Sequence, residues 1–478
     1  MSVNFIKALN IFKEKWLSDI RFWILLFFII RMYGITNAPL EVGHNWRQSL
    51  TNMIARNFLQ IDNNILYPRI DVDGNKSGIM ATEFPLFNYL IYLVAKIFGY
   101  SHWYGRLINL IISSFGIFYF YKIVKRFLTE PLAFYASLIL LSSIWFAFSR
   151  KSMPDTFCIS LVIIGIYHGL IYLYEKRFMS MILFFMFSSL GVLCKIPAIY
   201  LLSLFLISLF DKQIQVYLKI NLIIAGIGIL LLTIVWYFYW DPYLLTTFGI
   251  QLYFPKSLLD GFKELVTYAP DTFEKFYFSA LESFVAFALF LCGLFFIIKQ
   301  KQKTILFISL IASFFFFLFI CKTGYVFSTH SYYIIPYVPI MAIVAAFSLE
   351  KMKNKKLKIG IVFIVMVEGA LNQQYDLRIK DSEKYKLGME KMADKLSLKS
   401  DLVVINGGQN PQEIYFLNRR GWSVDKEKLA DHFSIRAWQQ KGAKYIFIDK
   451  HNENQVDLSK SFKVVYNDED FIVYSLRN

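Results

Sequence analysis

Long apolar runs separated by short polar segments fill most of the chain up to about residue 372. The clearest of these runs are 22–30, 107–121, 221–239 and 305–320. A helical run of about 20 apolar residues crosses a hydrocarbon core of roughly 30 Å. The pattern therefore predicts a polytopic α-helical membrane protein. The composition agrees, since 56% of the residues are hydrophobic and the mean hydropathy is +0.45.

Eleven runs have the length and composition expected of membrane spans. They cover about residues 21–38, 105–121, 131–148, 156–174, 179–194, 196–210, 219–239, 279–298, 304–321, 331–349 and 357–372. The first of them follows a basic amphipathic stretch and lacks a small-residue cleavage site. It is therefore expected to remain as a span and not to be removed as a signal peptide.

A further run, 84–99, is short and carries Asn88 and Lys96, so its topology depends on the charges that follow it. Basic clusters lie at 122–126, 176–177, 212–219, 299–303 and 351–358. Cytoplasmic loops carry an excess of lysine and arginine. If 84–99 does not cross, all these clusters share the cytoplasm with the N-terminus; if it crosses, all of them lie outside. We therefore expect about 11 transmembrane helices, with 84–99 along the outer surface.

The composition changes after about residue 372, where alternating patterns replace the long apolar runs. The segments 401–406, 444–449, 462–466 and 471–475 read as strands, and 411–417 and 426–440 as helices. The expected organisation is therefore a cytoplasmic interfacial helix at 1–20, a transmembrane domain at 21–372 that includes the outer loop 39–104, and a small extracytoplasmic α/β domain at 373–478.

The net charge of +16 does not indicate nucleic-acid binding, because the basic residues cluster at the ends of apolar runs as topology signals do. The four cysteines form no CxxC pair, and no histidines have ligand spacing, so neither a disulfide framework nor a metal site is predicted. No cofactor is required by the sequence, although the outer acids leave a divalent metal open.

The outer loop 39–104 is unusually long and charged for a polytopic protein, and we expect chemistry there. Its candidate acids and bases are Glu41, His44 and Glu83. Its candidate cations are Arg47 and Arg56. Simpler explanations also exist: an interfacial anchor would account for the residues near the first span, and a helix N-terminus favours a carboxylate anyway.

Further polar residues lie at other predicted outer ends of spans. Asp155 follows Pro154 where the fourth span begins, a position that capping alone would also explain. Lys195 lies at a span junction and would need an anionic partner unless it snorkels to the headgroups. His330, Tyr332 and Tyr333 open the tenth span and offer hydrogen-bond donors, or form an interfacial aromatic belt.

Carboxylates and cations together at an outer membrane surface suit a lipid-linked phosphate donor. Transfer of a sugar from such a donor needs a carboxylate to take the proton of the acceptor hydroxyl. It also needs cations to stabilise the departing phosphate. We therefore expect these acids and bases to converge on one pocket that opens away from the cytosol.

At these residues the chain resembles the GT-C superfamily of polyprenyl-phosphate-sugar glycosyltransferases, above all the aminoarabinose transferases of lipid A and the protein O-mannosyltransferases. The resemblance covers most of the length. Its motifs, in order, are IARNF (54–58), EFPLFNYL (83–90), GRLINLI (105–111), SRKSMPD (149–155), LCKIPA (193–198) and THSYYIIPYVP (329–339).

The resemblance implies an inverting glycosyltransferase with a polyprenyl-phosphate-linked sugar as donor and a lipid, glycan or protein as acceptor. Asp155 matches the second acid of the family, and Lys195 matches its phosphate-side lysine. The Asp-Glu pair that usually starts the outer loop is absent, since this region reads EVGHNWRQ from Glu41. Phe84 also replaces a common lysine. Glu83, or else Glu41 or His44, would then be the base.

The resemblance further implies a bacterial inner membrane, with the N-terminus cytoplasmic and the C-terminus periplasmic. Two alternatives remain: a transporter or flippase for a polyprenyl lipid or polysaccharide, and an O-antigen polymerase or ligase. The spans lack the paired charges and inverted repeat that carriers often show. The charged outer loop comes early in this chain, whereas polymerases and ligases typically place theirs late.

Overall fold

The computed structural model describes residues 16–251 and 256–477, and the chain divides into two compact units. Unit 1 comprises the described parts of Met1–Ile35, Arg106–Trp240 and Tyr253–Leu377. Unit 2 comprises those of Thr36–Gly105, Asp241–Leu252 and Arg378–Asn478. Most of the predicted interfacial helix 1–20 lies outside the described residues.

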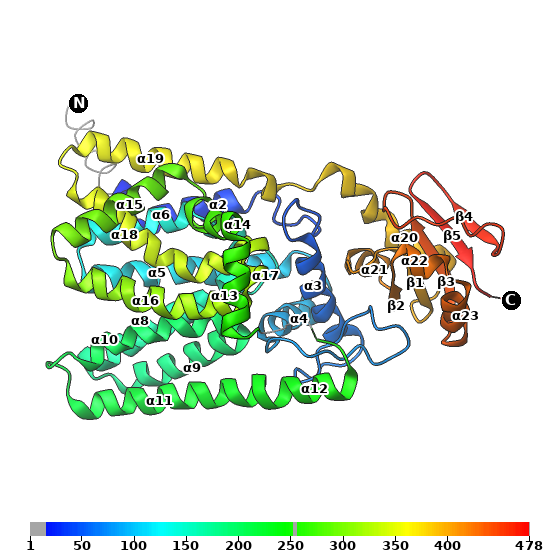
Figure 1. The fold of residues 1–478 in the computed structure, drawn as a ribbon, viewed down its shortest axis with the longest axis horizontal. Coiled ribbons are helices and arrows are strands. Elements are labelled where there is room, and N and C mark those ends of the chain that lie inside the picture. Colours follow the sequence, from blue (N-terminus) through cyan, green and yellow to red (C-terminus); the bar gives the residue numbers. More distant parts are fainter. Residues whose placement is uncertain (1–15, 252–255, 478) are drawn as a thin grey trace. The chain divides into compact units, whose positions relative to one another are not determined.

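Unit 1 is a bundle of helices (Figure 1). Its α-helices are α2 (Ile20–Arg31), α5 (Tyr104–Phe127), α6 (Glu130–Ser142), α7 (Trp145–Phe148), α8 (Asp155–Glu175), α9 (Phe178–Cys194), α10 (Phe205–Leu209), α11 (Val216–Ile234), α13 (Leu258–Thr267), α14 (Ala269–Glu274), α15 (Phe284–Lys299), α16 (Lys303–Thr323), α17 (Tyr325–Thr329), α18 (Val338–Lys351) and α19 (Lys355–Asn372). Shorter 3₁₀ and π segments are η1 (Ile196–Leu204), η2 (Val235–Trp240), η3 (Lys275–Ser279), η4 (Ser331–Tyr337) and η5 (Gln374–Leu377).

Every predicted span overlaps helical structure, but several are shorter or more broken than expected. Within the described residues, five helices are long and apolar enough to cross a membrane, or six if the bent pair 269–279 and 284–299 forms one span. The predicted span 196–210 is a 3₁₀ helix followed by a short α-helix, and α2 ends at Arg31, before the predicted end of the first span. The count of eleven remains a prediction.

Small residues allow the helices of unit 1 to pack closely. A Cβ atom on Gly191 of α9 would lie 2.7 Å from the carbonyl oxygen of Cys158 on α8. A Cβ atom on Gly116 of α5 would lie 2.4 Å from the hydroxyl of Ser160. Small residues at helix contacts are typical of membrane bundles, where packing replaces the hydrophobic effect as the driving force.

The segment before α8 is fixed by two buried cations of unit 1. The Arg150 guanidinium donates to the carbonyl oxygens of Arg31, Tyr33 and Asp376 at 2.7–2.9 Å. The Lys151 ammonium lies 2.8 Å from the Asp376 carboxylate. These cations are therefore used to hold the chain where it enters α8.

Unit 2 combines the outer loop, a short later segment and the C-terminal region. Its helices are α3 (Asn45–Gln60), α4 (Leu86–Phe98), α12 (Asp241–Phe248), η6 (Asp381–Gly388), α20 (Met389–Leu396), α21 (Gln412–Leu417), α22 (Lys426–Ala430) and α23 (His432–Gln440). The predicted helix 426–440 is thus two helices, and it breaks at Asp431, whose side chain caps α23. The helix α20 was not predicted.

A five-stranded sheet forms the centre of the C-terminal region, with strand order β2-β1-β3-β5-β4. The strands are β1 (Leu402–Ile405), β2 (Gly421–Ser423), β3 (Ala443–Asp449), β4 (Val464–Asn467) and β5 (Phe471–Ser475). β1 pairs in parallel with β2 and β3, whereas β5 is antiparallel to β3 and β4. Four of the strands lie where the sequence predicts them; β2, with three residues, was not predicted.

The outer loop and this sheet share one hydrophobic core. Met53 and Phe58 of α3 belong to the same buried cluster as Val403 and Phe447 of the sheet. The loop also extends the edge of β2, because the Gly74 N–H donates to the carbonyl oxygen of Gly421 at 2.7 Å. The compact units are therefore divided differently from the predicted domains 21–372 and 373–478, which remain a prediction.

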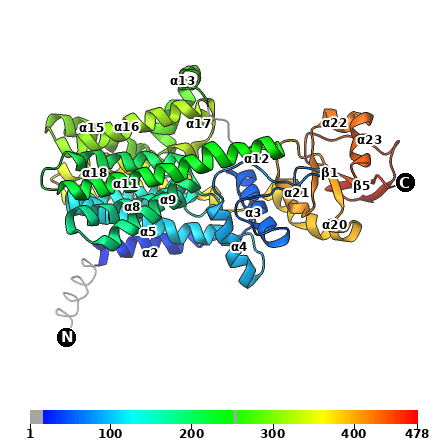
Figure 2. The same ribbon diagram turned by 90° about the horizontal axis from the view of Figure 1, so that it is seen from below.

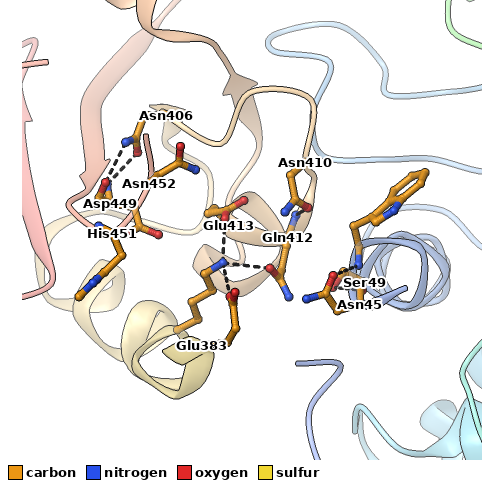
Figure 3. Close-up of polar contacts among 12 residues, drawn as sticks. Asn45, Ser49, Glu383, Asn406, Asn410, Gln412, Glu413, Asp449, His451 and Asn452 are labelled. Atoms are coloured by element: carbon orange, nitrogen blue, oxygen red, sulfur yellow. Dashed lines mark hydrogen bonds and ion pairs between the residues drawn. The ribbon is translucent and has the colours of Figure 1, made fainter. Parts of the chain in front are cut away.

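A buried lysine ties the segment before α20 to α21 (Figure 3). The Lys386 ammonium contacts the Glu383 carboxylate at 2.6 Å and the Glu413 carboxylate at 2.9 Å. It also donates to the side-chain oxygen of Gln412 at 2.9 Å, and the Gln412 amide in turn donates to the carbonyl oxygen of Pro39. The cluster joins the outer loop to the sheet by polar contacts as well as by the apolar core.

Candidate active site

A small pocket, referred to below as the cavity, lies among the helices of unit 1. It is lined by Asp155, Cys158, Ile159, Lys195, Pro197, Phe319, Tyr332, Tyr333 and Pro336. Four of these residues are candidates that the sequence analysis selected for their chemistry. The cavity therefore brings together an acid, a lysine and two tyrosines from three separate parts of the chain.

Asp155 and Lys195 meet because α8 and α9 form a helical hairpin. Asp155 is the first residue of α8 and follows Pro154, and Lys195 follows the last residue of α9 in an extended conformation. The Lys195 ammonium forms an ion pair with Oδ1 of Asp155. Their side chains are only 8% and 5% exposed. The other carboxylate oxygen, Oδ2, is buried with no hydrogen-bond partner among the described residues.

Two tyrosine rings enclose the lysine. The Lys195 ammonium lies 4.7 Å from the ring centre of Tyr332 and 5.4 Å from that of Tyr333, within cation–π range. The His330 ring packs edge-on against Tyr332, with 5.4 Å between ring centres. Partial burial lowers the pKa of His330 below its ordinary value of 6.5, so this imidazole is neutral at pH 7.

Five lining residues of the cavity were not predicted as site residues, among them Cys158, Phe319 and Pro336. Cys158 is one turn after Asp155, and its thiol contacts the backbone carbonyl of that residue at 3.0 Å. Phe319 and Pro336 lie within apolar runs. The spacing of Cys158 from Asp155 was a usable signal, because residues three apart share a helix face; an apolar run offers no such signal.

In unit 2, Glu83 pairs with Arg47. The Arg47 guanidinium lies 2.7 Å from the Glu83 carboxylate, and the two side chains are 12% and 25% exposed. The Thr82 hydroxyl donates to the same carboxylate oxygen at 3.4 Å. Asp241, which was not predicted, is close enough for its charge to interact with that of Glu83. The acid most favoured by the sequence is thus partly exposed and beside a second acid.

The other two candidate bases have different surroundings. Glu41 is 1% exposed, and one of its carboxylate oxygens accepts a hydrogen bond from the Gln48 side chain at 3.0 Å. His44 precedes α3 in the left-handed conformation, with φ of 56°. Glu41 is therefore buried, whereas His44, like Glu83, is partly exposed.

Arg56 is engaged within unit 2. Its guanidinium lies 2.9 Å from the Asp71 carboxylate and donates to the carbonyl oxygen of Tyr415 at 2.9 Å. It also lies 4.7 Å from the Tyr415 ring centre. The Arg56 side chain is 4% exposed, so these contacts leave a phosphate no access to it. We therefore drop Arg56 from the phosphate-binding set and assign it to the core.

The predicted residues thus form two groups in different units. Asp155, Lys195, His330, Tyr332 and Tyr333 lie in unit 1. Glu41, His44, Arg47, Arg56 and Glu83 lie in unit 2. Between residues 16 and 477, apart from 252–255, no three histidine, cysteine, aspartate or glutamate side chains gather as metal ligands would.

Known proteins provide independent comparisons. Residues 82–240 match the family described as dolichyl-phosphate-mannose-protein mannosyltransferase. No curated protein sequence matches the chain. Several solved structures are similar, among them the three below; each has low sequence identity, so they bear on the fold alone.

ArnT from Cupriavidus metallidurans in the apo state has a TM-score of 0.61 at 13% identity, over 95% of this chain and 97% of its own. The same protein bound to undecaprenyl phosphate has a TM-score of 0.59 at 13% identity, over 95% of this chain and 98% of its own. The archaeal oligosaccharyltransferase AglB from Archaeoglobus fulgidus, in complex with an inhibitory peptide and a dolichol-phosphate, has a TM-score of 0.52 at 10% identity, over 90% of this chain and 69% of its own. These matches confirm the expected resemblance: the chain has the fold of these solved structures, and its residues 82–240 are similar to this mannosyltransferase family.

Proposed function

We propose that the chain is a membrane glycosyltransferase that moves a sugar from a polyprenyl-phosphate donor to a lipid, glycan or protein acceptor. The observation that carries the proposal is the buried pair of Lys195 and Asp155 on the wall of the unit 1 cavity. A buried ion pair adds little net stability, because the desolvation of the two charges offsets their attraction. The family match at 82–240 and the GT-C fold support the same activity.

In this proposal the cavity holds the phosphate end of the donor. The Lys195 ammonium stabilises the negative charge that develops on the phosphate as the bond to the sugar breaks. Tyr332 and Tyr333 donate hydrogen bonds from their hydroxyls, and neutral His330 donates from a ring nitrogen. Asp155 orients the donor sugar by accepting hydrogen bonds from its hydroxyls.

The proposed base is Glu83, whose carboxylate is paired with the Arg47 guanidinium. The acceptor oxygen attacks the anomeric carbon, the bond from that carbon to the phosphate oxygen breaks, and Glu83 takes the acceptor proton. The products are an inverted glycoside and free polyprenyl phosphate. The step needs no co-reactant and no metal.

We place this reaction at the periplasmic face of a bacterial inner membrane, with the N-terminus in the cytoplasm. The distribution of basic clusters supports this orientation. It puts Glu83 and Asp155 on the same side of the bilayer. Reporter fusions at the loops that carry these two residues measure the orientation directly.

The test of the activity uses purified protein, polyprenyl phosphates that carry different radiolabelled sugars, and a membrane extract as source of acceptor. Label in a new product, with release of polyprenyl phosphate, supports the transferase. Movement of intact labelled donor across a vesicle membrane without bond cleavage refutes it and indicates a flippase. Lys195→Met is expected to lose transfer, whereas Lys303→Met, at an exposed lysine at the start of α16, keeps it.

A further inference from the structure

The helix α13 has three distinct faces, although only two are expected for a helix that packs on a protein in water. One face is packed inward and carries Gly261 and Leu265, which are buried. A second face is exposed and polar, with Asp260, Lys263 and Thr267. The third face is exposed and apolar: Leu258 is 45%, Leu259 63%, Phe262 44% and Val266 59% exposed. At 100° per residue these four residues span a continuous arc of about 100°.

The helix α13 crosses the end of α16. Figure 1 shows its axis running across the direction of α16 rather than along it, and Figure 2 shows α13 nearly end-on at the edge of the bundle. The two helices touch so closely that a Cβ atom on Gly261 would lie 1.7 Å from the carbonyl oxygen of Cys321, in the last turn of α16. α16 is long and apolar enough to cross a membrane, and α13 contacts its last turn.

Polar contacts at both ends of α13 fix this position. The Lys322 ammonium donates to the carbonyl oxygen of Lys256 at 3.0 Å, just before α13. The Glu264 carboxylate accepts a hydrogen bond at 2.7 Å from the Tyr325 N–H, which starts α17. Hydrogen bonds between side chains and the backbone therefore hold the helix on α16 and α17.

The apolar face of α13 continues the exposed face of α16. Phe262 packs edge-on against Phe317 of α16, with 6.1 Å between ring centres. Phe317 is the last of four exposed residues along one side of that span, where Phe307 is 54%, Leu310 56%, Phe314 59% and Phe317 itself 46% exposed. In a membrane span such a row faces lipid acyl chains. The exposed apolar side chains of α16 and α13 therefore form one continuous surface.

We infer that α13 is an interfacial membrane helix whose occupant is lipid: Leu258, Leu259, Phe262 and Val266 lie among acyl chains, and Asp260, Lys263 and Thr267 lie in water. An apolar arc beside a charged arc on a helix parallel to the bilayer is the arrangement of interfacial helices. Glu264 of α13 accepts a hydrogen bond from the start of α17, and η4, which follows α17, carries Tyr332, Tyr333 and Pro336 of the cavity wall. The inference does not depend on the proposed activity.

The test measures how often spin labels on α13 collide with two reagents, oxygen and a nickel complex. Oxygen concentrates in lipid, whereas the nickel complex stays in water. Single cysteines are placed at Leu259 and Val266 on the apolar arc and at Lys263 and Thr267 on the polar arc. The background is Cys292→Ser, because the other three cysteines are buried. The labelled full-length protein is reconstituted in nanodiscs of phosphatidylcholine and phosphatidylglycerol.

Labels on the apolar arc are expected to collide several-fold more with oxygen than with nickel, and those on the polar arc are expected to show the reverse. Equal nickel access on both arcs would overturn the inference, because α13 would then lie in water. Immobile labels at Leu259 and Val266, shielded from both reagents, would also overturn it and would indicate a protein partner or a second copy. Two positions on each arc guard against a single label that disturbs the fold.

Discussion

The pair of Lys195 and Asp155 can be tested for structural and chemical roles separately, by changing each residue alone and both together. Lys195→Met leaves the Asp155 carboxylate buried without its partner, and Asp155→Leu does the same to the ammonium. Both side chains are less than 10% exposed, so neither remaining charge can reach water without local unfolding. Removing one partner of such a pair costs about 3–5 kcal/mol.

The double variant Lys195→Met, Asp155→Leu removes both charges and keeps the volume similar. Replacing a buried ion pair by apolar residues is about neutral for stability. The free energies of the two single changes are therefore expected not to add, with an interaction energy of about 3 kcal/mol or more. Thermal unfolding of the four purified proteins in the same detergent measures this cycle.

Transfer activity separates the two roles. If Lys195 stabilises the departing phosphate, the double variant stays folded yet loses about 10²–10³-fold in turnover, the range seen when one donor to a developing anion is removed. A double variant with native stability and native turnover would refute the chemical role and reduce the pair to a structural contact. Additive destabilisation would instead refute the assumed coupling.

Three further predictions concern residues in both units. Arg56→Lys breaks buried contacts and is expected to destabilise unit 2 by about 3 kcal/mol in a denaturation assay, while turnover per folded molecule is unchanged. The control is Arg69→Lys, at a more exposed pair, which should cost less than about 1 kcal/mol in the same assay. Burial lowers the pKa of His330, so as the pH falls below 6.5 this histidine takes up a proton more readily in the unfolded chain than in the folded one. The thermal stability of the protein should therefore decline below pH 6.5, and the decline should be smaller in His330→Gln. Gly261→Ala forces α13 from α16 and should lower stability by about 1–3 kcal/mol, whereas Gly226→Ala, with open space at its Cβ position, should not.

Features that depend on local pattern could be predicted from the sequence. The strand 444–449 and the helix 411–417 lie where alternation and turn residues indicate them. The predicted span 196–210 differs because Pro197 and the preceding junction favour a 3₁₀ start that apolar composition does not reveal. Composition measures how apolar a segment is, but it does not fix how its backbone hydrogen bonds are made.

The role of Arg56 shows why long-range contacts were missed. Its acceptors are Asp71, which is 15 residues away, and the carbonyl oxygen of Tyr415, which is 359 residues away. No periodicity relates these positions, and an arginine in a charged outer loop has the same local pattern whether it meets a phosphate or a carboxylate. The sharing of one core by α3 and the sheet decides between the two, and only the structure contains that information.

The contact between Asp155 and Lys195 lies between a local pattern and a long-range contact. The two residues are 40 positions apart, but helix geometry alone accounts for their meeting. The 21 residues of α8 rise about 31 Å, and the 17 residues of α9 return about 26 Å. A two-residue turn joins the helices, so the chain comes back to within about one helical turn of its start. A lysine side chain is long enough to cover that difference. The hairpin lengths thus determine that Lys195 reaches Asp155, whereas the two tyrosines that enclose the ammonium come from a span more than 130 residues later and follow from no such count.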